Sequence, residues 1–94
     1  MSEKNKQEPK VHPNIYDFVT RDWDVSVSKE PHPQSDPSKK NSIDMRNFRC
    51  GVCLHKNIAY IHGWGFGSMA GGSTWNEFKC LECGHYTFFE QEWG

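Results

Sequence analysis

The sequence lacks any hydrophobic run long enough to cross a bilayer, since no apolar stretch approaches about 18 residues. Its first ten residues, MSEKNKQEPK, are polar and contain neither the apolar core nor the cleavage signal of a secretory leader. We therefore expect a soluble, intracellular protein that resides in a reducing compartment and has no membrane partner.

Basic charge is scarce where the aromatic residues gather. Residues 48–94 hold ten of the thirteen aromatic residues, but only three basic residues against four acidic ones. The charges of residues 1–47 cancel, and the whole chain carries a net charge of −1. Because neutralisation of phosphates by Lys and Arg supplies most nucleic-acid affinity, this balance predicts only weak autonomous binding to DNA or RNA.

Familiar catalytic motifs are also missing. The sequence has no P-loop, no Ser-His-Asp constellation and no pair of carboxylates spaced for acid–base chemistry. We therefore expect no enzyme activity, no catalytic residue and no small-molecule substrate.

Four cysteines are present, as two Cys-x2-Cys pairs: Cys50 with Cys53, and Cys80 with Cys83. Two intervening residues allow a tight turn to direct both sulfurs at one point, and two such turns supply the thiolates of a closed tetrahedral zinc site. Only 35 % of the residues are hydrophobic, and so small a core normally needs a metal to hold it together. We therefore expect one structural Zn²⁺.

Other arrangements of this site stay open. Two disulfides would suit a secreted domain, which the polar N-terminus does not favour. Four thiolates also accept iron. The match to a rubredoxin-like site is only partial, because such sites usually have glycine after each cysteine pair. Here Gly84 follows the second pair, but Leu54 follows the first. His55, His62 or His85 could replace one thiolate, but four well-spaced cysteines usually form an all-cysteine site.

Composition divides the chain into four segments. Residues 1–10 form a polar tail that we expect to be disordered. Residues 11–28 are an isolated apolar island, and residues 29–47 read as a proline-rich, solvated linker. Residues 48–94 hold the cysteines and form the predicted domain.

The apolar island at residues 11–28 has two parts. Pro13 suits the first turn of a short helix with Ile15 and Phe18 on one face. From Trp23 to Ser28 apolar and polar residues alternate, which predicts a short half-buried strand. The island either packs on the cysteine domain or is a flexible, partner-ordered docking arm, whose contacts would be Ile15, Phe18 and Trp23.

Three strands are predicted in the cysteine domain, over residues 57–62, 75–79 and 85–90. They would form a three-stranded antiparallel sheet with the metal at one end. Between the first two strands, residues 63–74 contain five glycines and read as an extended loop.

Three large apolar residues, Trp64, Phe66 and Met69, lie in this glycine-rich segment. They either fold back over the sheet as core, or form a recognition finger that anchors a protein partner. Stacking on nucleic-acid bases is less favoured, because no lysine or arginine lies nearby in the sequence. We expect the recognition finger.

The residues CGVC, a strand, a long hairpin and then FKCLECGHYTFFE resemble the C-terminal zinc ribbon of transcription elongation factor S-II and the ribbons of small RNA polymerase subunits. The likeness covers residues 48–90 and rests mainly on Cys80 to His85. It implies a zinc-ribbon fold and an accessory role in RNA polymerase or another nucleic-acid-processing complex. The S-II family carries an Asp-Glu pair at its hairpin tip for transcript cleavage, whereas residues 63–74 contain no carboxylate, so that activity is not implied.

Two further functions stay open beside this one. The chain could be a structural component of a larger assembly, such as a virion, in which the zinc only stabilises the fold. With iron in place of zinc, it would be an electron carrier of the rubredoxin kind.

Overall fold

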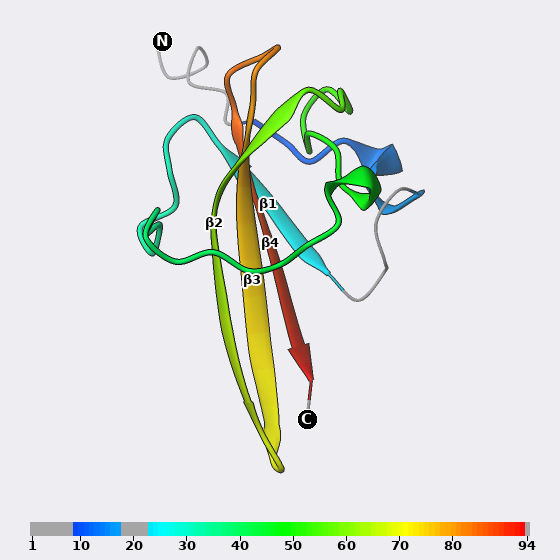
Figure 1. Cartoon of the computed structure of the whole chain (residues 1–94). Helices are drawn as coiled ribbons and strands as arrows, with labels where there is room; N and C mark the ends of the chain where they lie inside the picture. The colour runs from blue at the N-terminus through cyan, green and yellow to red at the C-terminus, as the bar shows by residue number, and fades with distance from the viewer. Residues whose placement is uncertain (1–8, 18–22, 94) are drawn as a thin grey trace, which may run out of the picture.

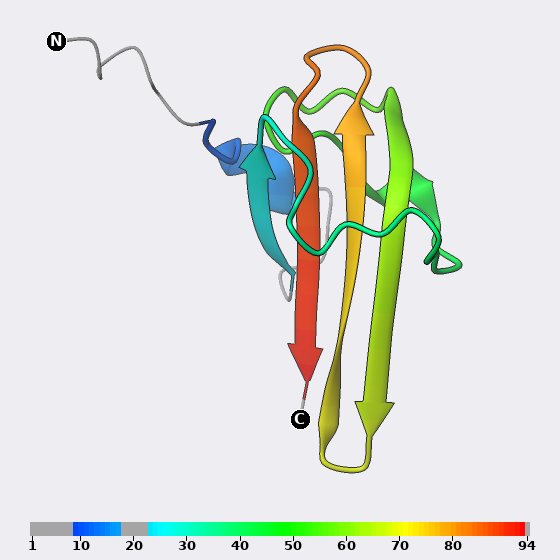
Figure 2. The same cartoon turned by 90° about the vertical axis from the view of Figure 1, so that its left-hand side faces the viewer.

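The computed structural model describes residues 9–17 and 23–93. Within these ranges the chain forms a small antiparallel sheet in the order β1-β4-β3-β2. Its strands are β1 (Asp24–Ser28), β2 (Ile58–Ser68), β3 (Gly71–Cys80) and β4 (Tyr86–Trp93), and two short 3-10 helices, η2 (Pro13–Asp17) and η3 (Met45–Asn47), accompany them. The hairpin of β2 and β3 extends away from the loop that joins β3 to β4 (Figures 1 and 2).

The sheet has four strands, which corrects the prediction of three. The additional strand, β1, pairs antiparallel with β4, with Val25 opposite Phe89. Its alternation of apolar and polar residues suits this position, because one face of the strand meets the core and the other meets solvent. Trp23, just before β1, packs edge-on against Phe48 and Phe89, with ring centroids 5.8 and 6.4 Å away.

The expectation of a flexible docking arm is corrected where the structure describes residues 11–28. Ile15, in η2, is fully buried and belongs to the core. Trp23 packs against the same core. Neither residue offers a docking surface, because a short apolar segment is more stable covering the sheet than exposed to water. Phe18 lies outside the described residues.

The core lies on one face of the sheet. Phe78 of β3 and Phe89 of β4 are fully buried there. Phe48 stacks on Phe78 at 5.1 Å between ring centroids and meets Phe89 edge-on at 4.9 Å. Burial of each of these rings contributes about 1.5–3 kcal/mol. This aromatic cluster adjoins two of the cysteines, Cys50 and Cys80, which are themselves buried.

Residues 29–39 cross the opposite face of the sheet, and residues 40–41 pass round its β2 edge toward Tyr60 and Asn76; we call residues 29–41 the strap (Figures 1 and 2). The sequence predicts a solvated linker here; most of these residues are exposed, but several of them pack on the sheet. The ring of His32 stacks on Phe88 at 3.8 Å between centroids, and the His32 N–H donates to Glu77 Oε2 at 2.8 Å. Polar residues can pack in this way because backbone groups and a histidine ring supply the contacts that apolar side chains would otherwise make.

The glycine-rich segment is a paired hairpin, which corrects the prediction of an extended loop. β2 and β3 pair without a register shift from Gly63 opposite Asn76 to Ser68 opposite Gly71, so that two residues form the turn. Alternation along a strand places the glycines at 63, 65 and 67 on the core face, and Trp64 and Phe66 on the strap face. A side chain at Gly63 would overlap Tyr60 Oη and Asn76 Oδ1. Glycine here makes room for neighbouring side chains.

Candidate metal centre

The predicted convergence of the four cysteines is confirmed. The Sγ atoms of Cys50, Cys53, Cys80 and Cys83 all lie within 4.8 Å of one another. The Cys50–Cys83 and Cys53–Cys80 pairs are each 3.6 Å apart. Tetrahedral thiolates around a metal at about 2.3 Å have sulfurs roughly 3.8 Å apart, whereas a disulfide needs about 2.05 Å. All four cysteines are free, so this cluster could hold one metal ion.

The two cysteine turns repeat one backbone pattern. In the first, the Leu54 N–H donates to the Cys50 carbonyl oxygen at 3.0 Å; in the second, the Gly84 N–H donates to that of Cys80, also at 3.0 Å. Leu54 and Gly84 both have positive φ, 65° and 81°. Such a backbone costs about 1–2 kcal/mol for a residue with a side chain, so the first turn holds the same geometry under strain at Leu54.

Backbone N–H groups surround two of the sulfurs. The N–H groups of Val52 and Cys53 donate to Cys50 Sγ at 3.3 and 3.5 Å, and those of Glu82 and Cys83 donate to Cys80 Sγ at 3.3 and 3.4 Å. Hydrogen bonds to the charged form of a group favour that form. The two turns are therefore built to accept negatively charged sulfur, which is the form that binds a metal.

The metal-free thiols have unequal pKa values. Burial raises the pKa of Cys53 to about 12, and it also raises the pKa of Cys83. Burial acts in the same direction on Cys80, but the N–H groups of Cys83 and Glu82 outweigh it and lower the pKa of that thiol. Protons must leave these sulfurs when a metal binds, so metal affinity rises with pH.

The first turn is fixed to the sheet through Gly51, a residue that the sequence did not single out. Its N–H donates to Thr87 Oγ1 at 2.9 Å, and its carbonyl oxygen accepts from the His12 N–H at 2.6 Å. A Cβ at Gly51 would lie 2.7 Å from Val27 Cγ1. These contacts join residues 24 to 39 positions apart in the sequence, and no local pattern could have predicted them.

The three histidines considered as ligands occupy different positions. His85 Nδ1 lies 3.3 Å from Cys83 Sγ, beside the cluster. The carbonyl oxygen of His55 accepts from the Cys50 N–H at 3.0 Å, while its side chain is exposed. His62 is buried under the strap. The metal-ligand cluster found among the described residues consists of the four cysteines alone.

His62 and Glu77 form a buried pair on the strap face. His62 Nε2 lies 3.0 Å from Glu77 Oε1. The two atoms are not aligned for a hydrogen bond, and neither has another partner in the described part of the chain. Burial lowers the pKa of His62, against the opposing effect of the Glu77 carboxylate. The folded protein therefore favours the neutral imidazole.

This pKa shift of His62 makes stability depend on pH. The unfolded chain binds a proton on this histidine near pH 6.5, whereas the folded chain binds it only at lower pH. The contribution of His62 to stability is therefore complete above about pH 6.5 and is lost as the pH falls toward the folded value.

The predicted finger residues lie on the hairpin, at the end remote from the cysteines. Phe66 is 59 % exposed, Trp64 is 41 % exposed and Met69, in the turn, is fully exposed. Trp64 meets Trp75 edge-on at 5.3 Å, and Lys39 of the strap places its Nζ 4.4 Å from the Trp64 ring centroid. The contact with this lysine could not be predicted from the sequence, because Lys39 comes from the strap, far from Trp64 along the chain.

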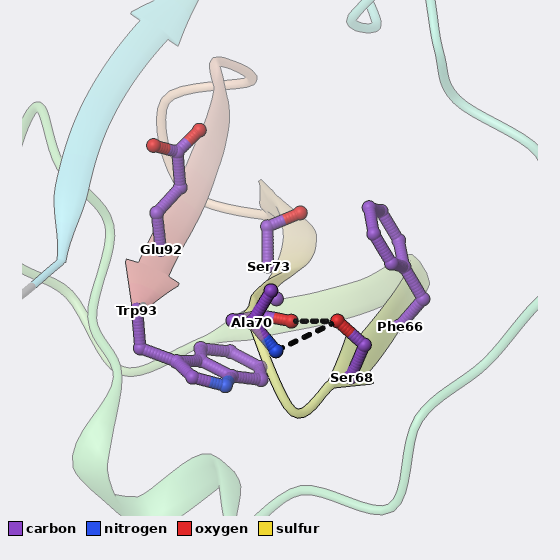
Figure 3. A pocket seen from close by; sticks show the side chains of 8 residues that line it. Phe66, Ser68, Ala70, Ser73, Glu92 and Trp93 are labelled. Atoms are coloured by element: carbon purple, nitrogen blue, oxygen red, sulfur yellow. Dashed lines mark hydrogen bonds between the residues drawn. The ribbon is translucent and has the colours of Figure 1, made fainter.

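A shallow hollow of about 320 Å³ lies near the hairpin turn. Figure 3 shows Phe66 and Trp93 on either side of it. Ser68 Oγ holds the turn by donating to the Gly71 carbonyl oxygen at 3.1 Å and accepting from the Ala70 N–H at 3.2 Å (Figure 3). Glu92 of β4 also lines the hollow, so a carboxylate lies beside a hairpin whose own residues 63–74 have none.

Comparison with protein-family models, with curated proteins and with solved structures finds no match to this chain. No helix in the described ranges combines the length and apolar character that a membrane span requires. The class that the fold and the site define is a small antiparallel β-sheet domain with four clustered cysteines.

Proposed function

We propose that the chain is a non-enzymatic zinc-ribbon module that binds one structural Zn²⁺ through its four cysteines and docks on a larger protein complex. The observation that carries the proposal is the closed cluster of four sulfurs within 4.8 Å of one another, held by two matching turns. Four thiolates leave no open coordination position for a substrate, so the metal's role is to stabilise the fold.

The exposed hairpin is the docking surface in this proposal. Trp64, Phe66 and Met69 lie at the end of the sheet opposite the metal site, and large aromatic side chains are common anchors at protein interfaces. Lys39 beside Trp64 is offset by Glu92 near Phe66, so this surface lacks the strong positive charge of a nucleic-acid footprint. We therefore expect a protein partner, with nucleic acid bound weakly or through the complex.

The proposal for the nature of the complex is supported only by the sequence resemblance of residues 48–90 to the zinc ribbons of transcription elongation factor S-II and of small RNA polymerase subunits. We propose an accessory role in transcription or another nucleic-acid-processing machine. Because residues 63–74 contain no carboxylate, the role that we propose is docking and not stimulation of transcript cleavage.

Metal analysis of the protein purified under reducing conditions tests the first part. One zinc per chain is the expected result. A red protein with iron in the four-thiolate site, or a protein that stays folded without metal, would contradict it.

Capture of partners from cells of origin tests the second part. Phe66→Ala should lose the partner, while Leu81→Ala should keep it, because Leu81 is equally exposed, at 58 %, but lies in the second cysteine turn. Both variants should retain zinc. Partners that survive Phe66→Ala, or that belong to a virion or another structural assembly, would contradict the proposal.

A further inference from the structure

One edge of the sheet is only partly covered. At Gly63 the strap lies against β2, because the Gly63 N–H donates to the Lys39 carbonyl oxygen at 2.9 Å. Five residues later the strand ends at Ser68, where the turn begins. In the part of the chain that the structure describes, no strand lies on the outer side of β2. We call residues 64–68 the open edge.

The direction of the backbone groups on the open edge follows from the β2–β3 ladder. The two strands pair without a register shift from Gly63 to Ser68. In an antiparallel ladder, successive residues direct their N–H and C=O groups alternately to the two sides. Since Gly63 donates outward, Gly65 and Gly67 also direct theirs outward. The open edge therefore presents two donors and two acceptors.

The residues of the open edge themselves carry no charge, proline or bulge that would oppose strand pairing. Soluble proteins normally protect an exposed edge with charge, proline or a bulge. The residues of the open edge, WGFGS, are neutral and contain no proline. The register irregularity of β2 lies between Tyr60 and His62, outside the open edge.

We propose that the open edge pairs with the same edge of a second copy of the chain, antiparallel, with Phe66 on the two-fold axis. Gly65 of each copy then lies opposite Gly67 of the other. Because both glycines direct their backbone groups outward, each pair exchanges two hydrogen bonds, and the dimer forms four. Phe66 meets its own symmetry mate as a non-hydrogen-bonded pair, in which side chains come closest.

The shape of the open edge selects a second copy as its occupant. Phe66 is the central residue of the five, and the strap at Gly63 blocks any longer strand. In a second copy, β2 ends at its own turn after Ser68. Its paired segment therefore stops where the strap of the first copy begins. No charged residue lies on either paired segment. The contact is smaller than the roughly 800 Å² per partner of a standard interface, so the dimer is weak and forms with rising concentration.

Sedimentation of the zinc-loaded protein over a range of concentrations tests the dimer. The average mass should rise from that of one chain toward twice that value. Phe66→Lys should abolish the rise, because it places two like charges on the two-fold axis. Ser26→Lys, on the exposed face of β1 at the far edge, should not. A protein that stays monomeric up to millimolar concentration, or a dimer that survives Phe66→Lys, would overturn the proposal.

Amide hydrogen exchange supplies a second measurement that needs no variant. Exchange at Gly65 and Gly67 should slow as the concentration rises, while exchange at Gly63, already bonded to the strap, should not change. Equal exchange at all concentrations would also overturn the proposal. Both experiments use the purified chain without any partner, so their outcome is independent of the proposed function.

Discussion

Replacement of Gly63 by alanine would raise the stability of the protein if the hairpin were a flexible loop, and would lower it if the hairpin is a packed strand. In a loop, the change would stabilise the protein by about 0.4–1 kcal/mol, because alanine restricts the unfolded chain. In the structure, the new Cβ would overlap Tyr60 Oη and Asn76 Oδ1 and would lie 3.0 Å from Asn41 Nδ2. The sign of the change in unfolding free energy therefore distinguishes the two.

The magnitude follows from the contacts around Gly63. Forcing a methyl group into a packed site costs about 1–3 kcal/mol. Tyr60 Oη donates to Asn76 Oδ1 at 3.1 Å, and Asn41 Nδ2 donates to the same oxygen at 3.2 Å. Loss of these hydrogen bonds costs about 0.5–1.5 kcal/mol each. After subtraction of the unfolded-state gain, we expect a loss of about 2–4 kcal/mol.

Urea unfolding of the zinc-loaded protein at neutral pH measures this loss. Gly67→Ala is the matched control, since it lies on the same face of the same strand. Its Cβ would meet only the half-exposed Trp93 ring, 3.3 Å away, so its effect should stay within about 1 kcal/mol of zero. An increase in stability for Gly63→Ala, or equal effects at the two positions, would refute the packed hairpin.

Three more variants test the metal site and the groups around it. Cys80→Ser should leave the protein unfolded, because a structural zinc contributes about 10–16 kcal/mol of apparent binding free energy; near-UV circular dichroism that matches the wild type would contradict this. Because burial lowers the pKa of His62, the free energy of unfolding at saturating zinc should fall as the pH drops from about 7.5 to 5.5. The fall should be less steep in His62→Gln. Equal slopes for the two proteins in urea titrations would exclude that histidine as the cause. Gly51→Ala should cost about 1–3 kcal/mol, since its Cβ would lie 2.7 Å from Val27 Cγ1 and 2.9 Å from Thr87 Cγ2, and Val27→Ala should recover part of that loss; simply additive costs would rule out the clash.

The strands were predicted with partial success, and the errors share a cause. The alternation at residues 23–28 correctly indicated a strand, but its pairing with β4 added a strand to the predicted three. Periodicity reports which residues of a segment share a face, and it does not report which neighbour that face meets. The sequence therefore left open whether this segment packs on the cysteine domain or on a partner. In the structure Trp23 and Ile15 pack within the chain.

The glycine-rich segment shows the same limitation. Five glycines in residues 63–74 indicate freedom when only the sequence is known. In the folded chain, a Cβ at Gly72 would lie 2.8 Å from Trp93 Cζ2, and one at Gly65 would lie 2.8 Å from the Ser73 carbonyl oxygen. Gly63, Gly65 and Gly72 are required by the close approach of neighbouring groups, and that requirement appears only once the strands are paired.

The sequence by itself determined the two cysteine turns, because two residues between cysteines suffice to direct both sulfurs of a pair at one point. The pairing of β2 with β3, which places Ile58 opposite Cys80, brings the two turns together. The sequence also determined that the chain would build β-structure around aromatic side chains. Only the tertiary structure decided that the strap covers His62 and Glu77, that Gly51 is held by Thr87, and that β2 has an open edge. Those features depend on residues brought together from distant parts of the chain, and a sequence pattern carries no record of which distant surfaces will meet.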